Sequence, residues 1–203
     1  MKRGLILDFG GVISRTLFET HAQTEMALGL PTGTLTWRGP FDPANDLLWQ
    51  RMQAHEISER DYWMARTRET GALLGETWDR METLVQRARG ADPDLVVRPE
   101  MLALITQARQ AGCKLAILSN ELDLFYGSAL RQRLSCLKDF DAIIDATYTG
   151  ILKPDARAYQ AARAGLEWGI SQAVQSNLCA AGTPSMTGTG LAEFSVSVTP
   201  SMA

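Results

Sequence analysis

The segment LILDFGGV, residues 5–12, places an aspartate directly after a short apolar run. The apolar run is typical of a buried parallel strand, and Asp8 marks its end. In a parallel α/β sheet, ligands bind beyond the carboxyl ends of the strands, so a carboxylate at this point lies where chemistry takes place. Gly10 and Gly11 allow a sharp turn and expose backbone amides that can hold an anion. Taken alone, an aspartate here equally well caps a turn.

Two further apolar runs follow later in the chain, and each also ends in polar residues. Residues 115–118 and 142–144 contain only leucine, isoleucine and alanine, and they are typical of buried strands. Residues 99–112 begin with proline and glutamate and end with glycine, which favours a helix over this range. The alternation of strand and helix predicts an α/β fold with a parallel sheet.

Polar side chains beyond these strands are candidate anion-binding groups. Ser119 and Asn120 directly follow the second strand, where a hydroxyl and an amide can bind a phosphoryl or carboxylate oxygen. A serine at this point equally well caps the helix that follows. Lys153 precedes Pro154, whose ring restricts the chain, so the ammonium can be directed at an anion. An isolated surface lysine is otherwise more often solvated.

Residues 16–90 differ from the rest of the chain because they show no strand pattern. Large apolar and aromatic side chains recur there at helical intervals, which predicts an inserted helical lobe. Ser58 and Asp61 resemble a capping box that begins one of its helices. We expect the aromatic side chains to serve mainly in hydrophobic packing. The tryptophans for which we expect this are Trp49, Trp63 and Trp78.

Taken together, the three polar segments indicate a particular protein family, which none of them does alone. Residues 5–12 resemble motif I of the haloacid dehalogenase superfamily, residues 118–120 resemble motif II, and residues 150–159 resemble motif III. The segment FDAIID, residues 140–145, also resembles the family's approach to its lysine. The motifs occur in the family's order, and the resemblance covers the chain from residue 1 to about residue 163.

The resemblance implies an α/β fold with a Rossmann-like parallel core and a helical cap insertion. Residues 1–15 and 91–165 would form the core, and residues 16–90 would form the cap. It also implies covalent catalysis, in which Asp8 attacks phosphorus or a halogen-bearing carbon and water cleaves the resulting ester. Lys153 would neutralise the charge of Asp8 and of the intermediate. The substrate-binding residues would be Ser119, Asn120, Gly10 and Gly11, and Asn120 would support either the substrate or the loop.

The chain departs from the family's phosphatases at two points. They usually carry a second aspartate two residues after the nucleophile, and Gly10 stands there in this chain. The general acid that this aspartate supplies is typically worth ~10²–10⁴-fold in rate. The family's acidic fourth motif is not visible after Lys153, which leaves Asp8 and the carbonyl of Gly10 as ligands for magnesium. We therefore expect Mg²⁺ to bind weakly or not at all.

The carboxyl-terminal segment, residues 166–203, is atypical of the rest. All 20 lysines and arginines of the chain lie at or before Arg163. Two explanations are open: a loosely ordered segment with little to bury, or a segment read out of frame. Ser176 and Asn177 faintly resemble the serine and asparagine that replace the acidic pair in the superfamily's dehalogenases, which need no metal.

The composition argues against nucleic acid and membrane surfaces as binding partners. A formal net charge of -3 offers no basic surface for nucleic acid or a membrane, so we expect a small-molecule substrate. The chain has neither a signal peptide pattern nor an apolar run long enough to span a membrane. Three cysteines are too few and too irregularly spaced for a disulfide framework or a zinc site, so we expect reduced thiols in the cytoplasm. They are Cys113, Cys136 and Cys179. The sequence does not indicate an oligomeric state.

These observations favour a haloacid dehalogenase-like hydrolase that acts weakly on a small phosphate ester, with a haloacid as the other substrate class. The alternative is a catalytically inactive relative that binds a small anion or a protein partner. Gly10 and the missing acidic motif support the alternative, whereas Asp8 with Ser119 and Lys153 supports the enzyme.

Overall fold

The computed structural model describes residues 3–89 and 92–168 and divides the chain into two compact units. In its described part, the first unit comprises residues 3–14, 97–123 and 134–168, and the second comprises 15–89, 92–96 and 124–133. Residues 124–133, which the sequence placed in the core, thus group with the helical stretch. The assignment of residues 16–90 as a cap stays a prediction.

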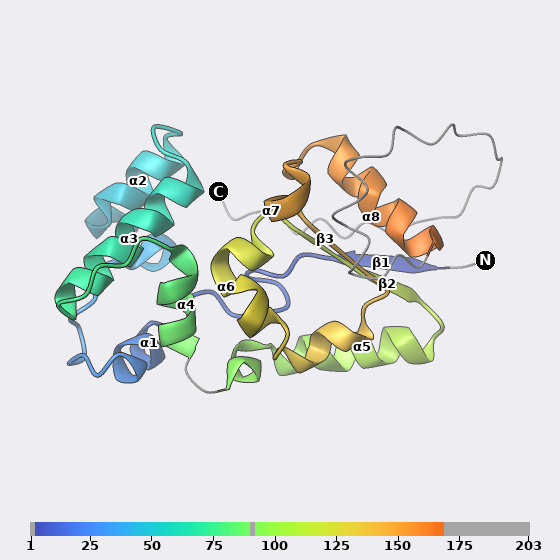
Figure 1. The fold of residues 1–203 in the computed structure, drawn as a ribbon, viewed down its shortest axis with the longest axis horizontal. Coiled ribbons are helices and arrows are strands. Elements are labelled where there is room, and N and C mark those ends of the chain that lie inside the picture. Colours follow the sequence, from blue (N-terminus) through green and yellow to red (C-terminus); the bar gives the residue numbers. More distant parts are fainter. Residues whose placement is uncertain (1–2, 90–91, 169–203) are drawn as a thin grey trace. The chain divides into compact units, whose positions relative to one another are not determined.

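A parallel sheet of three strands forms the centre of the first unit (Figure 1). Strands β1 (Gly4–Leu7), β2 (Lys114–Ser119) and β3 (Ala142–Asp145) lie in the order β1-β2-β3, so β2 is central. Both pairs are parallel, with Leu7 opposite Ile117 and Ser119 opposite Asp145. The three predicted strands and the predicted α/β class are confirmed.

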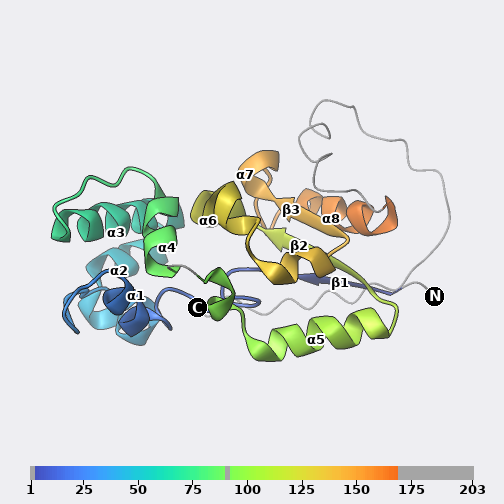
Figure 2. The same ribbon diagram turned by 60° about the horizontal axis from the view of Figure 1, so that its bottom comes forward.

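Helices α5 (Pro99–Gln110) and α8 (Ala156–Trp168) pack against this sheet. Figures 1 and 2 show α8 on one side of the strands and α5 on the other. The predicted helix over 99–112 is confirmed as α5, and Gly112 follows it with a φ of 73°. A positive φ of this kind favours glycine at the end of a helix.

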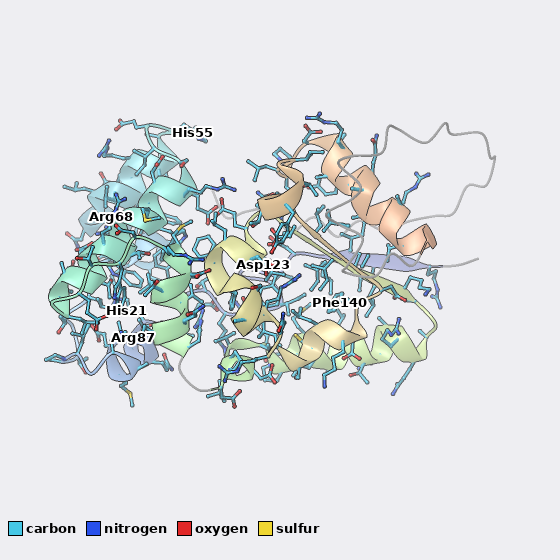
Figure 3. The ribbon with its side chains drawn as sticks, in the orientation of Figure 1. His21, His55, Arg68, Arg87, Asp123 and Phe140 are labelled. Carbon is cyan, nitrogen blue, oxygen red and sulfur yellow. The ribbon has the colours of Figure 1, made fainter. Side chains whose placement is uncertain are left out.

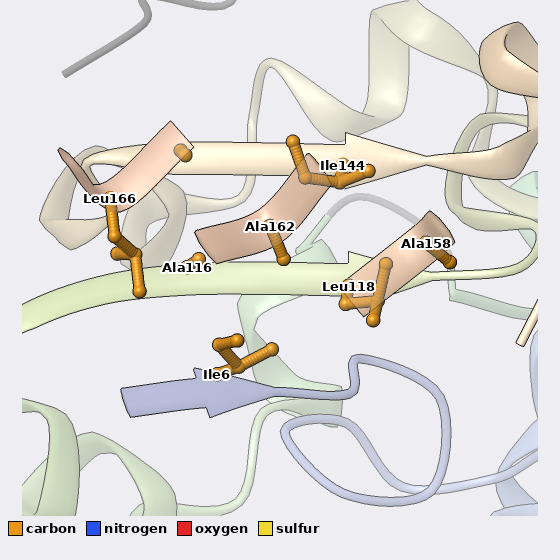
Figure 4. Close-up of a cluster of buried hydrophobic side chains, with 8 residues drawn as sticks. Ile6, Ala116, Leu118, Ile144, Ala158, Ala162 and Leu166 are labelled. Atoms are coloured by element: carbon orange, nitrogen blue, oxygen red, sulfur yellow. The ribbon is translucent and has the colours of Figure 1, made fainter. Parts of the chain in front are cut away.

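The face of the sheet under α8 is packed with small and branched side chains (Figure 4). Alanines on both surfaces allow the helix to approach closely, and a Cβ built on Gly165 would lie 2.8 Å from that of Ala142. Leu166 is buried in this cluster, so the packed helix continues past the predicted core boundary at residue 165. Residues 169–203, with most of the predicted atypical tail, lie outside the described residues. The cluster comprises Ile6, Ala116, Leu118, Ala142, Ile144, Ala158, Ala162 and Leu166.

The second unit is helical, and its described residues contain no strand. Ser58 accepts a hydrogen bond from the Asp61 N–H and Asp61 accepts one from the Ser58 N–H, which confirms the predicted capping box at the start of α3. The unit contains α1 (His21–Ala27), η1 (Gly39–Phe41), η2 (Pro43–Asn45), α2 (Leu47–Gln53), α3 (Glu59–Leu73), α4 (Met81–Arg89), η3 (Pro93–Val96) and most of α6 (Leu122–Arg131). None of the helices in the described residues is long and apolar enough to cross a membrane.

Aromatic rings form the centre of the second unit. Trp63 and Trp78 are buried as predicted, and Trp49 is half-buried against the rings of Phe18 and Tyr62. Edge-to-face contacts of this kind add to the stability gained by burial alone. The polar His21 and Arg87, labelled in Figure 3, belong to the same unit.

The first unit also contains two short helices. Helix η4 (Ser135–Asp139) follows residues 124–133, which group with the second unit, and α7 (Ala146–Thr149) follows β3 directly. Gly150 ends α7 with a φ of 66°. The loop between α7 and α8 therefore begins beside the carboxyl end of β3, which is where the predicted lysine lies.

Candidate active site

The carboxyl ends of the three strands bring the predicted polar residues to one edge of the sheet. Asp8 directly follows β1, Ser119 is the last residue of β2, and Asp145 is the last residue of β3. Because the strands are parallel and paired in register, these residues project from the same edge. This edge is where ligands bind in open α/β sheets.

Asp8 is engaged by a backbone donor and by a cation. The N–H of Phe9 donates to its Oδ1 at 2.7 Å, and the Nζ of Lys153 lies 2.7 Å from its Oδ2. The Lys153 side chain is 19% exposed and that of Asp8 is 39% exposed. The prediction that the Lys153 ammonium lies near the Asp8 carboxylate is confirmed. The pair is open enough for a ligand to reach the carboxylate.

The loop after Asp8 is held by hydrogen bonds that its backbone carbonyls accept. The N–H of Ser14 donates to the carbonyl of Phe9 at 2.9 Å, and the guanidinium of Arg98 donates to the carbonyl of Gly11 at 3.3 Å. Gly11 has a φ of 78°, a conformation that disfavours any residue with a Cβ. A turn held in this way keeps the Asp8 carboxylate at a defined place.

Unlike Gly11, Gly10 is not required to be glycine by its backbone conformation. Its φ is not among the positive values, and a Cβ added to it would meet no atom within 4 Å. A larger side chain would therefore fit at position 10. The consequence of glycine here is chemical, because no side chain is present to donate or accept a proton.

Lys153 lies in a loop whose main chain is held by Asn120. The N–H of Lys153 donates to the Asn120 Oδ1 at 2.6 Å, and the Asn120 Nδ2 donates to the carbonyl of Lys153 at 3.4 Å. The next peptide bond, from Lys153 to Pro154, is cis. Asn120, predicted to bind substrate, thus directs its amide at the lysine loop.

Ser119 combines the two roles that the sequence left open. Its Oγ accepts a hydrogen bond from the N–H of Glu121 at 3.3 Å, one residue before α6 begins. Its hydroxyl proton is a separate donor. The side chain can therefore support the turn and still donate to an oxygen of a ligand.

Two carboxylates at this edge were missed by the sequence reasoning. Asp145 is 1% exposed and accepts hydrogen bonds from the N–H groups of Asp123 and Thr147 at 2.7 and 2.9 Å. The hydroxyl of Tyr148 donates to Asp123, which Figure 3 labels. The sequence contained a signal for Asp145, because this residue follows an apolar run just as Asp8 does. These bonds give Asp145 a structural role in joining the end of β3 to Asp123 and to α7.

The described residues offer few ligands for a magnesium ion. They contain no group of three or more His, Cys, Asp or Glu side chains that could hold a metal. Magnesium requires octahedral oxygen ligands, and the Lys153 ammonium already lies against one oxygen of Asp8. Ser176 and Asn177 lie outside the described residues.

Comparison with known proteins adds independent findings. The profile of a hydrolase family, described as haloacid dehalogenase-like hydrolase, matches residues 3–174. No curated protein sequence matches the chain. Among solved structures, the HAD-hydrolase YfnB from Bacillus subtilis, bound to magnesium, is 17% identical with a TM-score of 0.53, over 78% of this chain and 70% of that one. This likeness shows a common fold.

A second solved structure is an L-2-haloacid dehalogenase from Xanthobacter autotrophicus with chloropropionic acid covalently bound. It is 21% identical to this chain with a TM-score of 0.46, over 84% of this chain and 66% of that one.

Proposed function

Because the chain belongs to the haloacid dehalogenase-like hydrolase family, we propose that it hydrolyses a small phosphate ester with Asp8 as its nucleophile. The observation that carries this proposal is the carboxylate of Asp8 at the carboxyl edge of the sheet, 2.7 Å from the Lys153 ammonium. A carboxylate paired with a cation in a partly exposed position can both attack a substrate and tolerate its negative charge.

The proposed reaction has two steps. In the first, an oxygen of Asp8 forms a bond to phosphorus, and the bond from phosphorus to the alkoxide breaks with its electron pair on the alkoxide. In the second, water attacks the aspartyl phosphate, which releases inorganic phosphate and restores the carboxylate. Lys153 stabilises the charge of the transferring group, and the Ser119 hydroxyl donates to one of its oxygens.

Turnover of alkyl esters should be slow because position 10 offers no proton to the leaving alkoxide. A general acid typically contributes ~10²–10⁴-fold, and a good leaving group removes most of that requirement. An aryl phosphate is therefore the better probe of this chain. We expect at most a weak response to Mg²⁺.

A haloacid is the second candidate substrate, and Gly10 favours it. In that reaction Asp8 would attack the carbon that bears the halogen, and the halide would leave with the electron pair of the broken bond. Water would then cleave the aspartyl ester to give the hydroxy acid and the restored carboxylate. Because a halide needs no proton to leave, the absence of an acid at position 10 carries no cost here.

The proposal also covers the class of substrate and the cellular location. We propose a small-molecule substrate and a cytoplasmic location, the latter because the three cysteines do not form a disulfide framework pattern. The alternative function, binding of an anion without turnover, uses the same edge of the sheet and differs only in the chemistry that follows.

The test measures nitrophenolate release from an aryl phosphate and halide release from a 2-haloacid, with the wild type and Asp8→Asn. We expect slow release from the aryl phosphate by the wild type and none by Asp8→Asn, because an amide cannot form the covalent ester. Activity that survives in Asp8→Asn would refute the nucleophile assignment. Halide release alone would select the haloacid, and no release from either substrate would select the inactive alternative.

A further inference from the structure

We propose that Asn120 is a positioning residue that holds the main chain of Lys153, so that the ammonium reaches Asp8, and that it acts without contacting the substrate. The inference rests on the proposed function, since it assigns a role within that site. It concerns Asn120 because both polar atoms of its side chain bond the main chain of Lys153.

Both polar atoms of the Asn120 amide are used on one residue. Its Oδ1 accepts from the Lys153 N–H at 2.6 Å, and its Nδ2 donates to the Lys153 carbonyl at 3.4 Å. The first distance is short for an N–H···O bond and the second is long, so the first bond is the stronger one. A pair of bonds to the N–H and the carbonyl of the same residue restricts both its position and its orientation.

The position of the Lys153 main chain matters because the lysine side chain is long. Four rotatable carbons separate its ammonium from the backbone, and that freedom must be lost for the Nζ to lie 2.7 Å from Asp8. Asn120 directly follows Ser119, the last residue of β2. It is therefore attached to the central strand. Its hydrogen bond to Lys153, 33 residues away in sequence, restricts the motion of the lysine loop relative to the sheet.

This assignment predicts a loss in chemistry rather than in substrate binding. In Asn120→Ala the Lys153 loop loses its support, and the ammonium no longer stays at the carboxylate. Displacement of a catalytic group by ~1 Å can cost about 10²-fold in rate. We expect kcat for the aryl phosphate to fall about 10- to 100-fold, with KM changed less than about twofold.

A double-mutant cycle separates positioning from a general structural effect. If Asn120 acts through Lys153, Asn120→Ala should lower kcat in the wild type but should have almost no further effect in Lys153→Ala. Asn120→Asp keeps an acceptor for the 2.6 Å bond and should retain more activity than Asn120→Ala. Thr149→Ala is the matched control, because it removes a hydrogen bond to Ile151 in the same loop and none to Lys153.

A second measurement does not depend on activity. The chain has four lysines, Lys2, Lys114, Lys138 and Lys153, so acetylation of each can be followed by mass spectrometry. Lys114 pairs with Asp141 at 2.7 Å in the same unit and serves as the internal reference. Relative to Lys114, acetylation of Lys153 should rise several-fold in Asn120→Ala and should not change in Thr149→Ala.

The outcomes distinguish this inference from the proposed function. An increase in KM with unchanged kcat in Asn120→Ala, or an equal loss of kcat in the presence and absence of Lys153, would overturn the positioning role. If the wild type shows no Asp8-dependent turnover of either substrate, the proposed function fails and the acetylation measurement decides the inference alone. Unchanged Lys153 acetylation in a folded Asn120→Ala, or in a folded Asn120→Leu, which also removes both hydrogen bonds, would then refute it.

Discussion

At the scale of single residues, two adjacent glycines have different reasons to be glycine. Gly11 adopts a φ of 78°, so a side chain there would strain the turn that follows Asp8. Gly10 has an ordinary φ and open space around it. The backbone therefore requires the second glycine and tolerates replacement of the first. This difference makes the missing general acid a feature that one substitution can restore.

We expect Gly10→Asp to raise the hydrolysis of alkyl phosphates more than that of aryl phosphates. A carboxyl group at position 10 can protonate a poor leaving group, and such an acid is worth ~10²–10⁴-fold where it is needed. Gly11→Asp is the control and should lower stability instead. The rates for one alkyl and one aryl ester check this, and an equal gain for both esters would argue against general acid catalysis.

At the scale of elements, a buried carboxylate joins three helices of the second unit. Asp46 accepts hydrogen bonds from the N–H groups of Gly39 and Trp49, from the hydroxyl of Tyr62 and from the guanidinium of Arg66. Burial by itself would raise the pKa of Asp46, but these donors outweigh it and lower the pKa below its usual value. The ion pair between Asp46 and Arg66 thus links η1, α2 and α3.

Asp46→Ala should lower the free energy of unfolding of the protein by about 3 kcal/mol, because it leaves the buried Arg66 without its buried partner. Asp42→Ala is the matched control: this carboxylate lies four residues earlier and bonds the exposed Asn45. Loss of an exposed interaction should cost less than about 0.5 kcal/mol. Urea unfolding of the two variants measures the difference, and equal values would show that the buried network contributes little.

At the scale of the whole molecule, the two units carry different titratable groups. Burial, followed by the charge of Arg38, lowers the pKa of His21 in the second unit. In the first unit, burial would raise the pKa of Asp141, but hydrogen bonds from Lys114 and the Leu115 N–H lower it overall. The units should therefore respond to acid in different pH ranges.

His21 is a base with a lowered pKa, so the unfolded chain binds its proton first as the pH falls. The stability linked to His21 is present above its ordinary pKa of 6.5 and is lost as the pH falls below that value. The stability linked to Asp141 is lost only below its ordinary pKa of 3.8. The second unit should thus weaken before the first.

The measurement is urea unfolding at about pH 7.5 and about pH 5.5, followed by tryptophan fluorescence. Trp37 lies 5.0 Å from His21, ring to ring, so its emission reports on the relevant unit. The wild type should be less stable at the lower pH, and His21→Gln should lose most of that difference. The other histidine, His55, is exposed, and His55→Gln is the matched control. An unchanged pH dependence in His21→Gln would remove His21 as the cause.

The sequence alone determined the elements that are decided by local pattern. Apolar runs predicted the three strands, proline and glycine predicted the bounds of α5, and Ser58 with Asp61 predicted the start of α3. The order of the motifs placed Asp8 and Lys153 together. These succeed because strand burial, capping and helix termination depend on a few neighbouring residues.

Only the tertiary structure decided which partners each polar side chain takes. The sequence left open whether Asn120 supports a substrate or a loop, and in the structure its amide bonds the main chain of Lys153, 33 residues away. Asp46 carried no motif and is the buried centre of a network that reaches Arg66. A hydrogen bond between distant residues depends on how the chain packs, and spacing along the sequence does not encode that.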